Sequence, residues 1–276
     1  MVVFPNCKIN LGLFITARRA DGYHDIETVM VPVPWCDILE IVPSPDGSDR
    51  LTVTGNTLGD CPPEKNLVMR AVRALRQTVE FPAVDIHLHK IIPDGAGLGG
   101  GSSDAAFTVT TLNSLFGLGM SQDQMADVCA TVGSDCPFFV YNRPMLATGR
   151  GTDLTAVDIP DLAGYTLVIV KAADAHVSTA QAYAGVTPRA EAMAIPDILA
   201  RPVDQWSALL VNHFEDSVMA KAPSVAAVKQ QLDSMGAVYT AMTGSGAAVF
   251  GLFDKPFGHD TIQQQFPGCQ STVCSL

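Results

Sequence analysis

Basic residues are scarce in this sequence, and their scarcity excludes two classes of partner. Lys and Arg together number 17 against 28 Asp and Glu, which gives a formal net charge of −11 at pH 7. Binding to nucleic acid or to an acidic membrane surface relies on clustered Lys and Arg, so we expect neither partner. An anionic ligand must then be held locally, by backbone dipoles and a few placed cations.

Long apolar runs are also missing. No stretch approaches the roughly 20 consecutive apolar residues of a membrane-spanning helix. The first ten residues, MVVFPNCKIN, lack the basic region, apolar stretch and cleavage site of a secretory signal. We therefore expect a cytoplasmic protein without a membrane partner, and the sequence leaves monomer and homodimer both open.

The cysteines form no recognisable site. There are seven, an odd number, and no two of them are spaced as C-x-x-C, which argues against a disulfide framework and against a zinc site. We expect reduced thiols that mostly fill the core. His87 and His89 share one face of an expected strand, but an exposed strand face explains them better than a metal site.

Strand and helix patterns are intermingled without strict βαβ alternation, which predicts an α+β fold. A hairpin is expected where the apolar stretch 8–17 is followed by the turn signal Asp21-Gly22 and the strand-like stretch 23–34. The segment SDCPFFVY, 134–141, is interpreted as buried extended chain. Further strands are expected at 37–42, 50–55, 83–92 and 165–171, helices at 66–79, 103–119, 121–133 and 224–236, short strands around 242–253, and a final helix and strand.

A change of composition indicates a seam between two domains. Residues 148–164, TGRGTDLTAVDIPDLAG, are rich in Gly, Asp and Thr. We predict an amino-terminal domain over 1–155 and a carboxy-terminal domain over 156–276.

The stretch PDGAGLGGGSSDAA, 93–106, places five glycines in a loop between an expected strand and an expected helix. Such a loop offers free N–H groups and the positive end of a helix dipole to an anion. It is not a Walker loop, because no lysine lies between Lys90 and Lys171. A dinucleotide fingerprint matches formally at Gly95, Gly97 and Gly100, but the loop follows several strands instead of the first one.

A purely structural glycine turn is the third alternative. Each glycine costs up to ~1 kcal/mol of backbone entropy relative to alanine, so packing alone explains the loop poorly. The interpretation that remains is a nucleoside triphosphate loop, which uses backbone N–H groups and the hydroxyls of Ser102 and Ser103 in place of a lysine.

Three motifs in this order resemble the GHMP small-molecule kinases: PNCKINL at 5–11, PDGAGLGGGSSDAA at 93–106 and MTGSGAAVF at 242–250. The resemblance implies an α+β fold with an amino-terminal domain related to ribosomal protein S5 domain 2 and a ferredoxin-like carboxy-terminal domain. It also implies phosphorylation of an alcohol by ATP, which enters as its magnesium complex. The ATP-binding residues implied are Pro93, Asp94, Gly95, Ala96, Gly97, Leu98, Gly99, Gly100, Gly101, Ser102 and Ser103.

The segment RADGYH, 19–24, and the triple glycine are similar to one branch of the family, whose members phosphorylate a cytidine-diphosphate-linked polyol in the non-mevalonate route to isoprenoids. One departure is Cys7, where the family usually has a small residue before the motif lysine; a thiol beside a lysine suggests a reactive cysteine, although strand alternation argues against it. The resemblance implies a small-molecule substrate with a cytidine diphosphate moiety, bound by Asn10, Tyr23, His24, Thr179, Tyr183, Gly244, Ser245 and Gly246.

Lys8 and Asp135 are the catalytic residues that the resemblance implies. Independently of it, Lys8 stands alone in an apolar strand, and burying an unpaired charge is costly, so a distant carboxylate partner is expected. Three alternatives stay open: a sibling kinase for homoserine or mevalonate, a non-catalytic nucleotide-binding protein, and a dinucleotide-dependent oxidoreductase. The sequence identifies no metal ligands.

Overall fold

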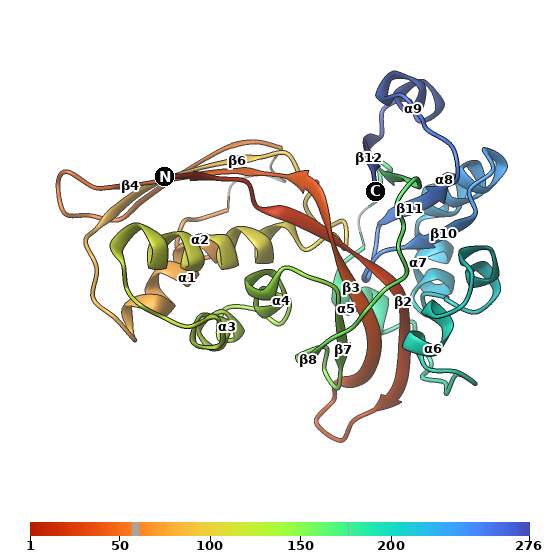
Figure 1. Ribbon diagram of the computed structural model, residues 1–276, viewed down its shortest axis with the longest axis horizontal. Helices are drawn as coiled ribbons and strands as arrows, with labels where there is room; N and C mark the ends of the chain where they lie inside the picture. The colour runs from red at the N-terminus through yellow and green to blue at the C-terminus, as the bar shows by residue number, and fades with distance from the viewer. Residues whose placement is uncertain (57–60, 176) are drawn as a thin grey trace. The chain divides into compact units, whose positions relative to one another are not determined.

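Two units make up the fold, and the chain passes between them several times. The computed structural model describes residues 1–56, 61–175 and 177–276 (Figure 1). Unit 1 combines Met1–Lys8, Pro32–Asp94 and Gly99–Arg143, and unit 2 combines Ile9–Val31, Gly95–Leu98 and Pro144–Leu276. The division into domains at residue 155 stays a prediction.

Unit 1 is built on a sheet with the strand order β1-β4-β6-β5. The neighbours β4 and β6 are antiparallel, and β5 and β6 are parallel. Side chains alternate along β6, so that Val84, Ile86 and Leu88 are buried and Lys90 lies on the same buried face. The strands are β1 (Val2–Val3), β4 (Ile38–Pro43), β5 (Arg50–Gly55) and β6 (Val84–Lys90).

The ends of three helices of unit 1 follow from their sequence. Asn66 caps the helix that begins at Leu67, because its side chain accepts a hydrogen bond from Val68 N. Ser121 and Gln124 form the predicted capping box of the helix that begins at Gln122. Gly117, with φ 60°, ends the helix that begins at Gly100, in the left-handed region that glycine adopts readily. Unit 1 contains the helices α1 (Leu67–Arg76), α2 (Gly100–Phe116), α3 (Gln122–Ala130) and α4 (Cys136–Tyr141).

The structure corrects the sequence interpretation at three places. Residues 136–141 form the helix α4 instead of extended chain. Asp135 takes the N-cap position, and Pro137 stands in the first turn. The missing N–H of a proline costs no hydrogen bond there, because N–H groups of a first turn have no intrahelical acceptor. The helix α3 ends at Ala130, short of Gly133. The helix α2 begins at Gly100, three residues before Ser103, so part of the glycine loop is its first turn.

A long hairpin connects the units along the chain. Its strands β2 (Asn6–Arg18) and β3 (His24–Cys36) are neighbours in a sheet of order β2-β3-β7-β8, which confirms the expected hairpin. The remaining strands, β7 (Met145–Thr148) and β8 (Asp153–Ala156), pair with each other antiparallel.

Unit 2 has a second sheet, of antiparallel order β10-β11-β9-β12. Its inner strands β9 and β11 are buried along their whole length, and side chains of the helix α8 belong to the same core cluster. The strands are β9 (Thr166–Lys171), β10 (Tyr239–Met242), β11 (Ala248–Phe253) and β12 (Gln270–Ser275); the helices are α5 (Thr179–Tyr183), α6 (Ile195–Leu199), a 3-10 turn (Val203–Ala208), α7 (Glu215–Lys221), α8 (Pro223–Ser234) and α9 (His259–Gln265).

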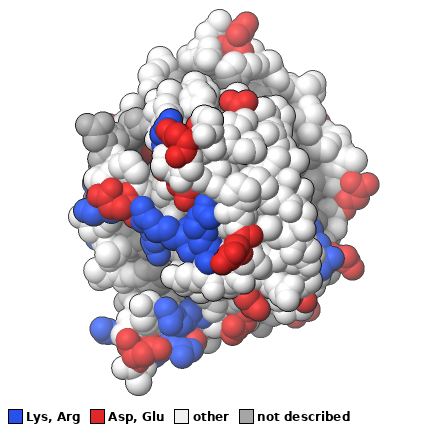
Figure 2. Space-filling view, turned by 90° about the vertical axis from the view of Figure 1, so that its left-hand side faces the viewer, with Lys and Arg blue, Asp and Glu red and all other residues white. Residues whose placement is uncertain are grey.

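Charged side chains of both signs are mixed on the surface. Figure 2 shows one face, where Lys and Arg side chains gather directly beside Asp and Glu side chains. In the described residues Arg19 Nη1 lies 2.8 Å from Asp25 Oδ1, and Arg76 Nη2 lies 2.8 Å from Asp49 Oδ1. On that face, Asp and Glu side chains border the Lys and Arg side chains that lie together near its centre. Within the described ranges, no helix has the length and apolar character to cross a bilayer.

Candidate active site

Lys8 and Asp135 lie close together in unit 1. Lys8 is on β2, where ten consecutive residues from Asn6 are buried, and its own exposure is 3 %. Its Nζ is 3.8 Å from Oδ2 of Asp135, whose side chain is 41 % exposed directly before α4. Burial lowers the pKa of Lys8, and the Asp135 carboxylate partly offsets this effect. The carboxylate partner expected for Lys8 is therefore Asp135, which is itself open to a ligand.

The first turn of α2 lies against Lys8. Gly99, with φ 72°, takes the N-cap position without a side-chain hydrogen bond. A Cβ on Gly99 would lie 2.9 Å from Phe139 Cζ and 3.2 Å from Lys8 Cγ, so only glycine allows this approach. The N–H groups of a first helical turn have no intrahelical acceptor, and the dipole favours an anion there.

Two serines follow in the same turn. The Ser103 Oγ is buried and has no hydrogen-bond partner among the described residues. The Ser102 hydroxyl forms a hydrogen bond with the thiol of Cys136, whose pKa burial raises to about 11. The orphaned hydroxyl and the open N–H groups fit a phosphate ligand at this helix start.

A cavity of about 630 Å³ in unit 1 adjoins this helix start. Apolar side chains from the sheet and from α1 line it together with polar ones, and Gly101 of α2 forms part of its wall. Its volume is in the range of small-molecule sites. The lining includes Leu51, Val53, Leu67, Leu88, Asn66 and Lys90.

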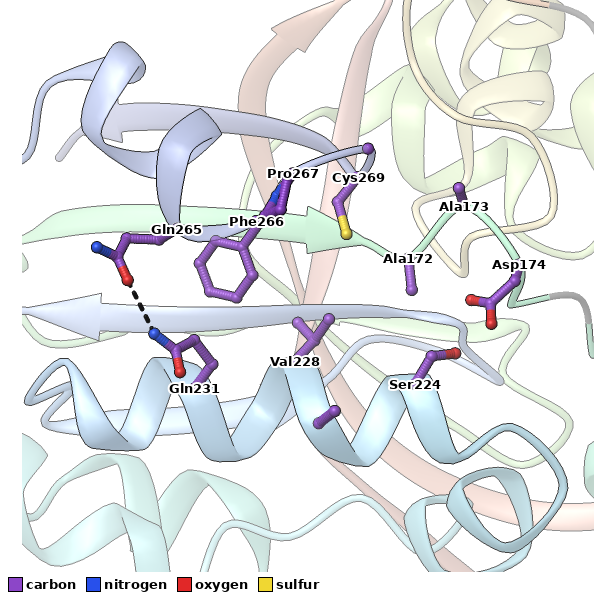
Figure 3. A pocket seen from close by; sticks show the side chains of 12 residues that line it. Ala172, Ala173, Asp174, Ser224, Val228, Gln231, Gln265, Phe266, Pro267 and Cys269 are labelled. Carbon is purple, nitrogen blue, oxygen red and sulfur yellow. Dashed lines mark hydrogen bonds between the residues drawn. The ribbon is translucent and has the colours of Figure 1, made fainter.

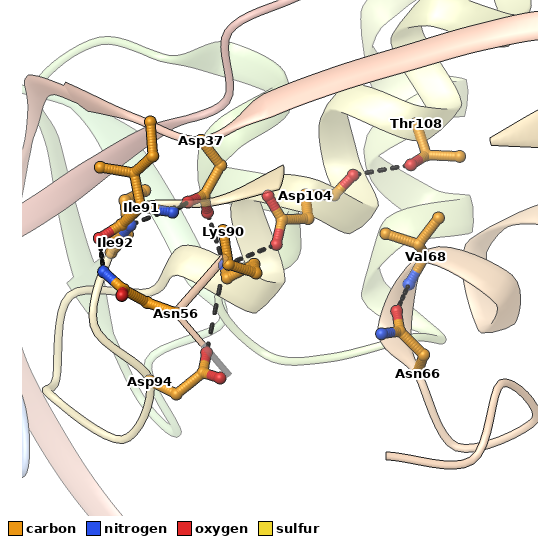
Figure 4. Close-up of polar contacts among 10 residues, drawn as sticks. All are labelled: Asp37, Asn56, Asn66, Val68, Lys90, Ile91, Ile92, Asp94, Asp104 and Thr108. Atoms are coloured by element: carbon orange, nitrogen blue, oxygen red, sulfur yellow. Dashed lines mark hydrogen bonds and ion pairs between the residues drawn. The ribbon is translucent and has the colours of Figure 1, made fainter. Parts of the chain in front are cut away.

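Lys90 is the centre of a buried cluster that the sequence analysis did not identify (Figure 4). Its Nζ lies 2.5 Å from Asp37 Oδ2 and 2.8 Å from Asp104 Oδ2, and 4.0 Å from Asp94 Oδ1. Burial alone lowers the pKa of Lys90, but the two buried carboxylates outweigh it and raise this pKa. Burial and the neighbouring Asp37 raise the pKa of Asp104 to about 8, against the effect of Lys90.

The three sequence motifs meet in unit 2. Asn10 N donates to Thr243 Oγ1 at 3.1 Å, and Thr243 Oγ1 lies 3.2 Å from Asn10 Oδ1 and 3.3 Å from Gly97 O. A Cβ on Gly97 would lie 2.1 Å from Thr243 O. Asn10 is 3 % exposed, and its Nδ2 donates to Thr28 Oγ1 at 2.9 Å. The structure thus gives Asn10 a buried place in this network.

Aromatic rings gather elsewhere in unit 2. The rings of His24 and Tyr183 are stacked at 5.1 Å with an interplanar angle of 25°, and Tyr183 meets Phe214 edge-on at 4.7 Å. Tyr23 precedes β3 and is 53 % exposed, with the Arg150 guanidinium 3.7 Å from its ring centre. Two of the predicted substrate-binding residues, His24 and Tyr183, are therefore in contact.

The other predicted substrate residues lie in the turn after β10, which contains Gly244, Ser245 and Gly246, and at Thr179, the first residue of α5. Gly244 and Gly246 have φ 55° and 86°, and Ser245 Oγ lies 3.1 Å from Thr179 Oγ1. Asn212, which is not part of this turn, donates from its Nδ2 to the carbonyls of Met242 and Gly244 at 2.7 and 2.8 Å. These two hydrogen bonds hold the backbone of the turn in place.

Several of these residues escaped the sequence analysis. Arg150 and Asn212 contact residues that are distant in the sequence, and no pattern in the residues around them indicates these contacts. Lys90 could have been found from the sequence, because the alternation of β6 places this lysine on the buried face of the sheet. A lysine among buried apolar residues is the same feature that identified Lys8.

The remaining predictions concern thiols and metals. Cys7, Cys129, Cys136 and Cys274 are buried, and the Cys7 Sγ lies 3.8 Å from Val33 O. His87 Nε2 and His89 Nδ1 lie 3.0 and 2.9 Å from Thr54 Oγ1 on an exposed strand face. Among the described residues, no group of three or more His, Cys, Asp or Glu is arranged to hold a metal ion.

A second cavity, of about 490 Å³, lies in unit 2 (Figure 3). Ala172, Val228 and Phe266 contribute apolar surface, and Gln231 Nε2 donates to Gln265 Oε1 at 2.9 Å along one side. None of the predicted site residues lines this cavity.

Comparisons with known proteins agree with this arrangement. The family model for the GHMP kinases N terminal domain matches residues 66–143, and the model for the GHMP kinases C terminal matches 194–268. The chain is 47 % identical to the 4-diphosphocytidyl-2-C-methyl-D-erythritol kinase of Parabacteroides distasonis, over 98 % of this chain and 97 % of the relative. It is 48 % identical to the enzyme of that name from Porphyromonas gingivalis, over 93 % of each.

Solved structures agree as well. The crystal structure of a 4-(cytidine 5'-diphospho)-2C-methyl-D-erythritol kinase superposes with a TM-score of 0.83 at 28 % identity, over 99 % of this chain and 98 % of that one. The mevalonate kinase of Methanococcus jannaschii shares the fold, with a TM-score of 0.69 at 13 % identity over 100 % and 98 %. The predicted two-domain α+β fold is confirmed. From the two family models and the near full-length relatives, it follows that this chain belongs to the GHMP kinase family.

Proposed function

We propose that this GHMP kinase transfers a phosphoryl group from ATP to a hydroxyl of 4-diphosphocytidyl-2-C-methyl-D-erythritol, in the non-mevalonate route to isoprenoids. Relatives of that name at 47 and 48 % identity support the substrate. The observation that carries the chemistry is the pair of Lys8 and Asp135, 3.8 Å apart, beside the first turn of α2. We place the protein in the cytoplasm.

The pair suits phosphoryl transfer to an alcohol. This reaction needs an aligned hydroxyl, a group that orients it or accepts its proton, and charge that stabilises the transition state. The exposed Asp135 carboxylate is available to the acceptor hydroxyl, and the buried Lys8 ammonium holds that carboxylate and stabilises developing negative charge.

The first turn of α2 suits the phosphates of the donor. Gly100 to Ser102 provide N–H groups without an intrahelical acceptor and the positive end of a dipole, and Ser103 provides its orphaned hydroxyl. The adjoining cavity of about 630 Å³ has room for the nucleoside. When bound with ATP, magnesium would offset phosphate charge, and we assign it no protein ligand.

Unit 2 carries the residues that we propose for the cytidine diphosphate. The base is proposed to stack on Tyr23 and Tyr183 and to form a hydrogen bond with His24, and each stacking contact contributes ~1–3 kcal/mol. Because His24 and Tyr183 already stack on each other, a base that enters between them must separate the two rings. Stacking lets a chain with a net charge of −11 hold a nucleotide without a basic patch. Thr179 and the turn Gly244–Gly246 are proposed to contact the rest of the substrate.

The proposal is tested with an assay that couples ADP release to a spectroscopic signal. The purified chain is given ATP and either the cytidine-linked methylerythritol, homoserine or mevalonate. We expect turnover with the first acceptor and none above background with the others. Turnover of homoserine or mevalonate alone would overturn the substrate assignment.

A further inference from the structure

The end of β6 is held by a carboxylate that the proposed chemistry does not use. Asp37 is fully buried between β3 and β4. Its Oδ1 accepts hydrogen bonds from Ile91 N at 2.5 Å and Ile92 N at 2.8 Å, and its Oδ2 from Lys90 Nζ at 2.5 Å (Figure 4). The strand ends at Lys90, and Pro93 has no N–H. Asp37 therefore satisfies both N–H groups between the strand and the glycine loop.

The carbonyl groups of the same segment are held from the other side. Asn56 N donates to Lys90 O at 2.8 Å, and Asn56 Nδ2 donates to Ile91 O at 3.2 Å. A Cβ on Gly55, whose φ is 85°, would lie 2.2 Å from Lys90 O, so this close approach requires glycine. The backbone that leads into the glycine loop is thus fixed through both its donors and its acceptors.

Lys90 links this segment to the helix at the far end of the glycine loop. Besides Asp37, its Nζ donates to Asp104 Oδ2 at 2.8 Å, and Asp104 is in the second turn of α2. A Cβ on Gly100 would lie 3.2 Å from the same Nζ. One ammonium group therefore lies between the strand that enters the loop and the helix that leaves it.

Stability alone does not account for this cluster. Burying charged groups is costly, and apolar side chains of similar size often replace a buried ion pair without loss of stability. The cluster has two carboxylates for one ammonium, and burial together with the neighbouring Asp37 raises the pKa of Asp104. Such groups are retained in some proteins because they select one conformation.

We propose that Asp37 is a positioning residue for the phosphoryl donor. It holds Lys90, Ile91 and Ile92 so that the helix start at Gly99–Ser103 is formed before a nucleotide binds, which spares ATP the cost of ordering it. The inference rests on the proposed function, because it assigns the phosphates of ATP to that helix start.

Asp49 offers a matched control at the opposite end of the same strand. Its Oδ1 accepts hydrogen bonds from Val84 N at 2.9 Å and from Arg76 Nη2 at 2.8 Å. Asp37 and Asp49 thus each hold one end of β6 through backbone N–H and one basic side chain. Only Asp37 is at the end that continues into the glycine loop.

The test compares Asp37→Asn with Asp49→Asn in the full chain. An amide can accept on one side only, and its NH₂ would face either Lys90 or the N–H groups. Calorimetry gives the Kd for ATP, and steady-state kinetics give kcat and both KM values. For Asp37→Asn we expect the Kd and KM for ATP to rise about tenfold, with kcat and the acceptor KM within about twofold. Asp49→Asn is expected to lower Tm and to leave all four constants within about twofold.

An unchanged Kd for ATP in folded Asp37→Asn, or an equal rise in Asp49→Asn, would overturn the proposal. If Asp37→Asn does not fold, Asp37→Glu takes its place, because it keeps the charge and moves the carboxylate by one methylene group relative to Lys90 and the two N–H groups. It is expected to raise the Kd for ATP about threefold, and an unchanged Kd would then overturn the proposal. A wild-type chain that binds ATP without phosphorylating any acceptor contradicts the proposed function, yet the comparison of Kd values still decides the role of Asp37.

Discussion

The Lys8 ammonium lies 3.8 Å from the Asp135 carboxylate, and the two side chains differ in exposure, at 4 % and 41 %. A buried cation thus holds an accessible carboxylate in place. The pair is local in space but separated by most of unit 1 in the sequence. We expect the two residues to depend on each other in catalysis.

Replacing either residue should abolish most activity. We predict that Lys8→Ala and Asp135→Ala each fold and lose about 10²–10⁴-fold in kcat, the range for a lost acid–base group. Asp123→Ala is the control, because Asp123 is an exposed carboxylate of the same unit that pairs with Tyr141 OH at 2.9 Å. Steady-state kinetics and circular dichroism on the three variants provide the check. Near wild-type kcat in either site variant would refute the assignment.

Replacing Gly99 at the start of α2 should affect the kinetics with ATP, whereas replacing Gly117 at its end should not. Gly99 and Gly117 have φ 72° and 60°, so alanine at either position strains the backbone by about 1–2 kcal/mol. Only the Cβ at 99 would press on Phe139 and Lys8; a Cβ at 117 meets nothing within 4 Å. We expect both variants to lower Tm, and only Gly99→Ala to raise the KM for ATP or to lower kcat. Equal kinetics in the two variants would contradict this role of the helix start.

The aromatic side chains should affect only the cytidine-linked substrate. Because one stacking contact contributes ~1–3 kcal/mol, Tyr23→Ala and Tyr183→Ala should each raise the acceptor KM by about 5- to 150-fold. The KM for ATP is expected to stay within about twofold. Tyr141→Ala, a change in unit 1, controls for the loss of a tyrosine. The hypothesis fails if the acceptor KM is the same in all three variants.

Stability should fall in mild acid because of His213. Its Nδ1 accepts a hydrogen bond from Ile15 N at 3.0 Å, so in the neutral ring Nε2 carries the proton and donates to Glu191 Oε1 at 2.8 Å. Burial lowers the pKa of His213 below the ordinary value of 6.5, although Glu191 opposes this shift. Below pH 6.5 the unfolded chain therefore binds a proton that the folded chain does not, and the free energy of unfolding decreases as the pH falls.

Denaturant unfolding at pH 8 and pH 5.5 measures this effect. His213→Gln should reduce the difference between the two free energies of unfolding, whereas His259→Gln, at an exposed histidine, should not. The pKa of Glu191 is lowered by Arg189 and His213 against the effect of burial, so its contribution is lost only below its ordinary value of 4.5. An unchanged difference in His213→Gln would exclude the histidine as the cause.

Local patterns in the sequence predicted most elements because they are set by neighbours along the chain. The hairpin at Asp21-Gly22 and the capping box of Ser121 and Gln124 depend on a few adjacent residues. The segment 136–141 was interpreted wrongly because six apolar residues show no period, and Pro137 suits a first helical turn as well as extended chain.

The site was predictable only where a motif or an anomaly marked it. A lysine within an apolar strand indicated a distant carboxylate for Lys8, but no pattern identified Asp135 apart from the family resemblance. Asp37 and Asn212 act on backbone groups more than 25 residues away, and such pairings arise from tertiary structure. The contact of Asn10, Gly97 and Thr243 is of the same kind.

The most direct test of the account is product analysis by mass spectrometry. Wild-type chain and Asp135→Ala are each incubated with ATP, magnesium and the cytidine-linked methylerythritol. We predict one phosphorylated product per ADP with the wild type, and a loss of about 10²-fold or more with the variant. A wild-type chain that forms no phosphorylated product, or a variant that forms it at the wild-type rate, would contradict the account.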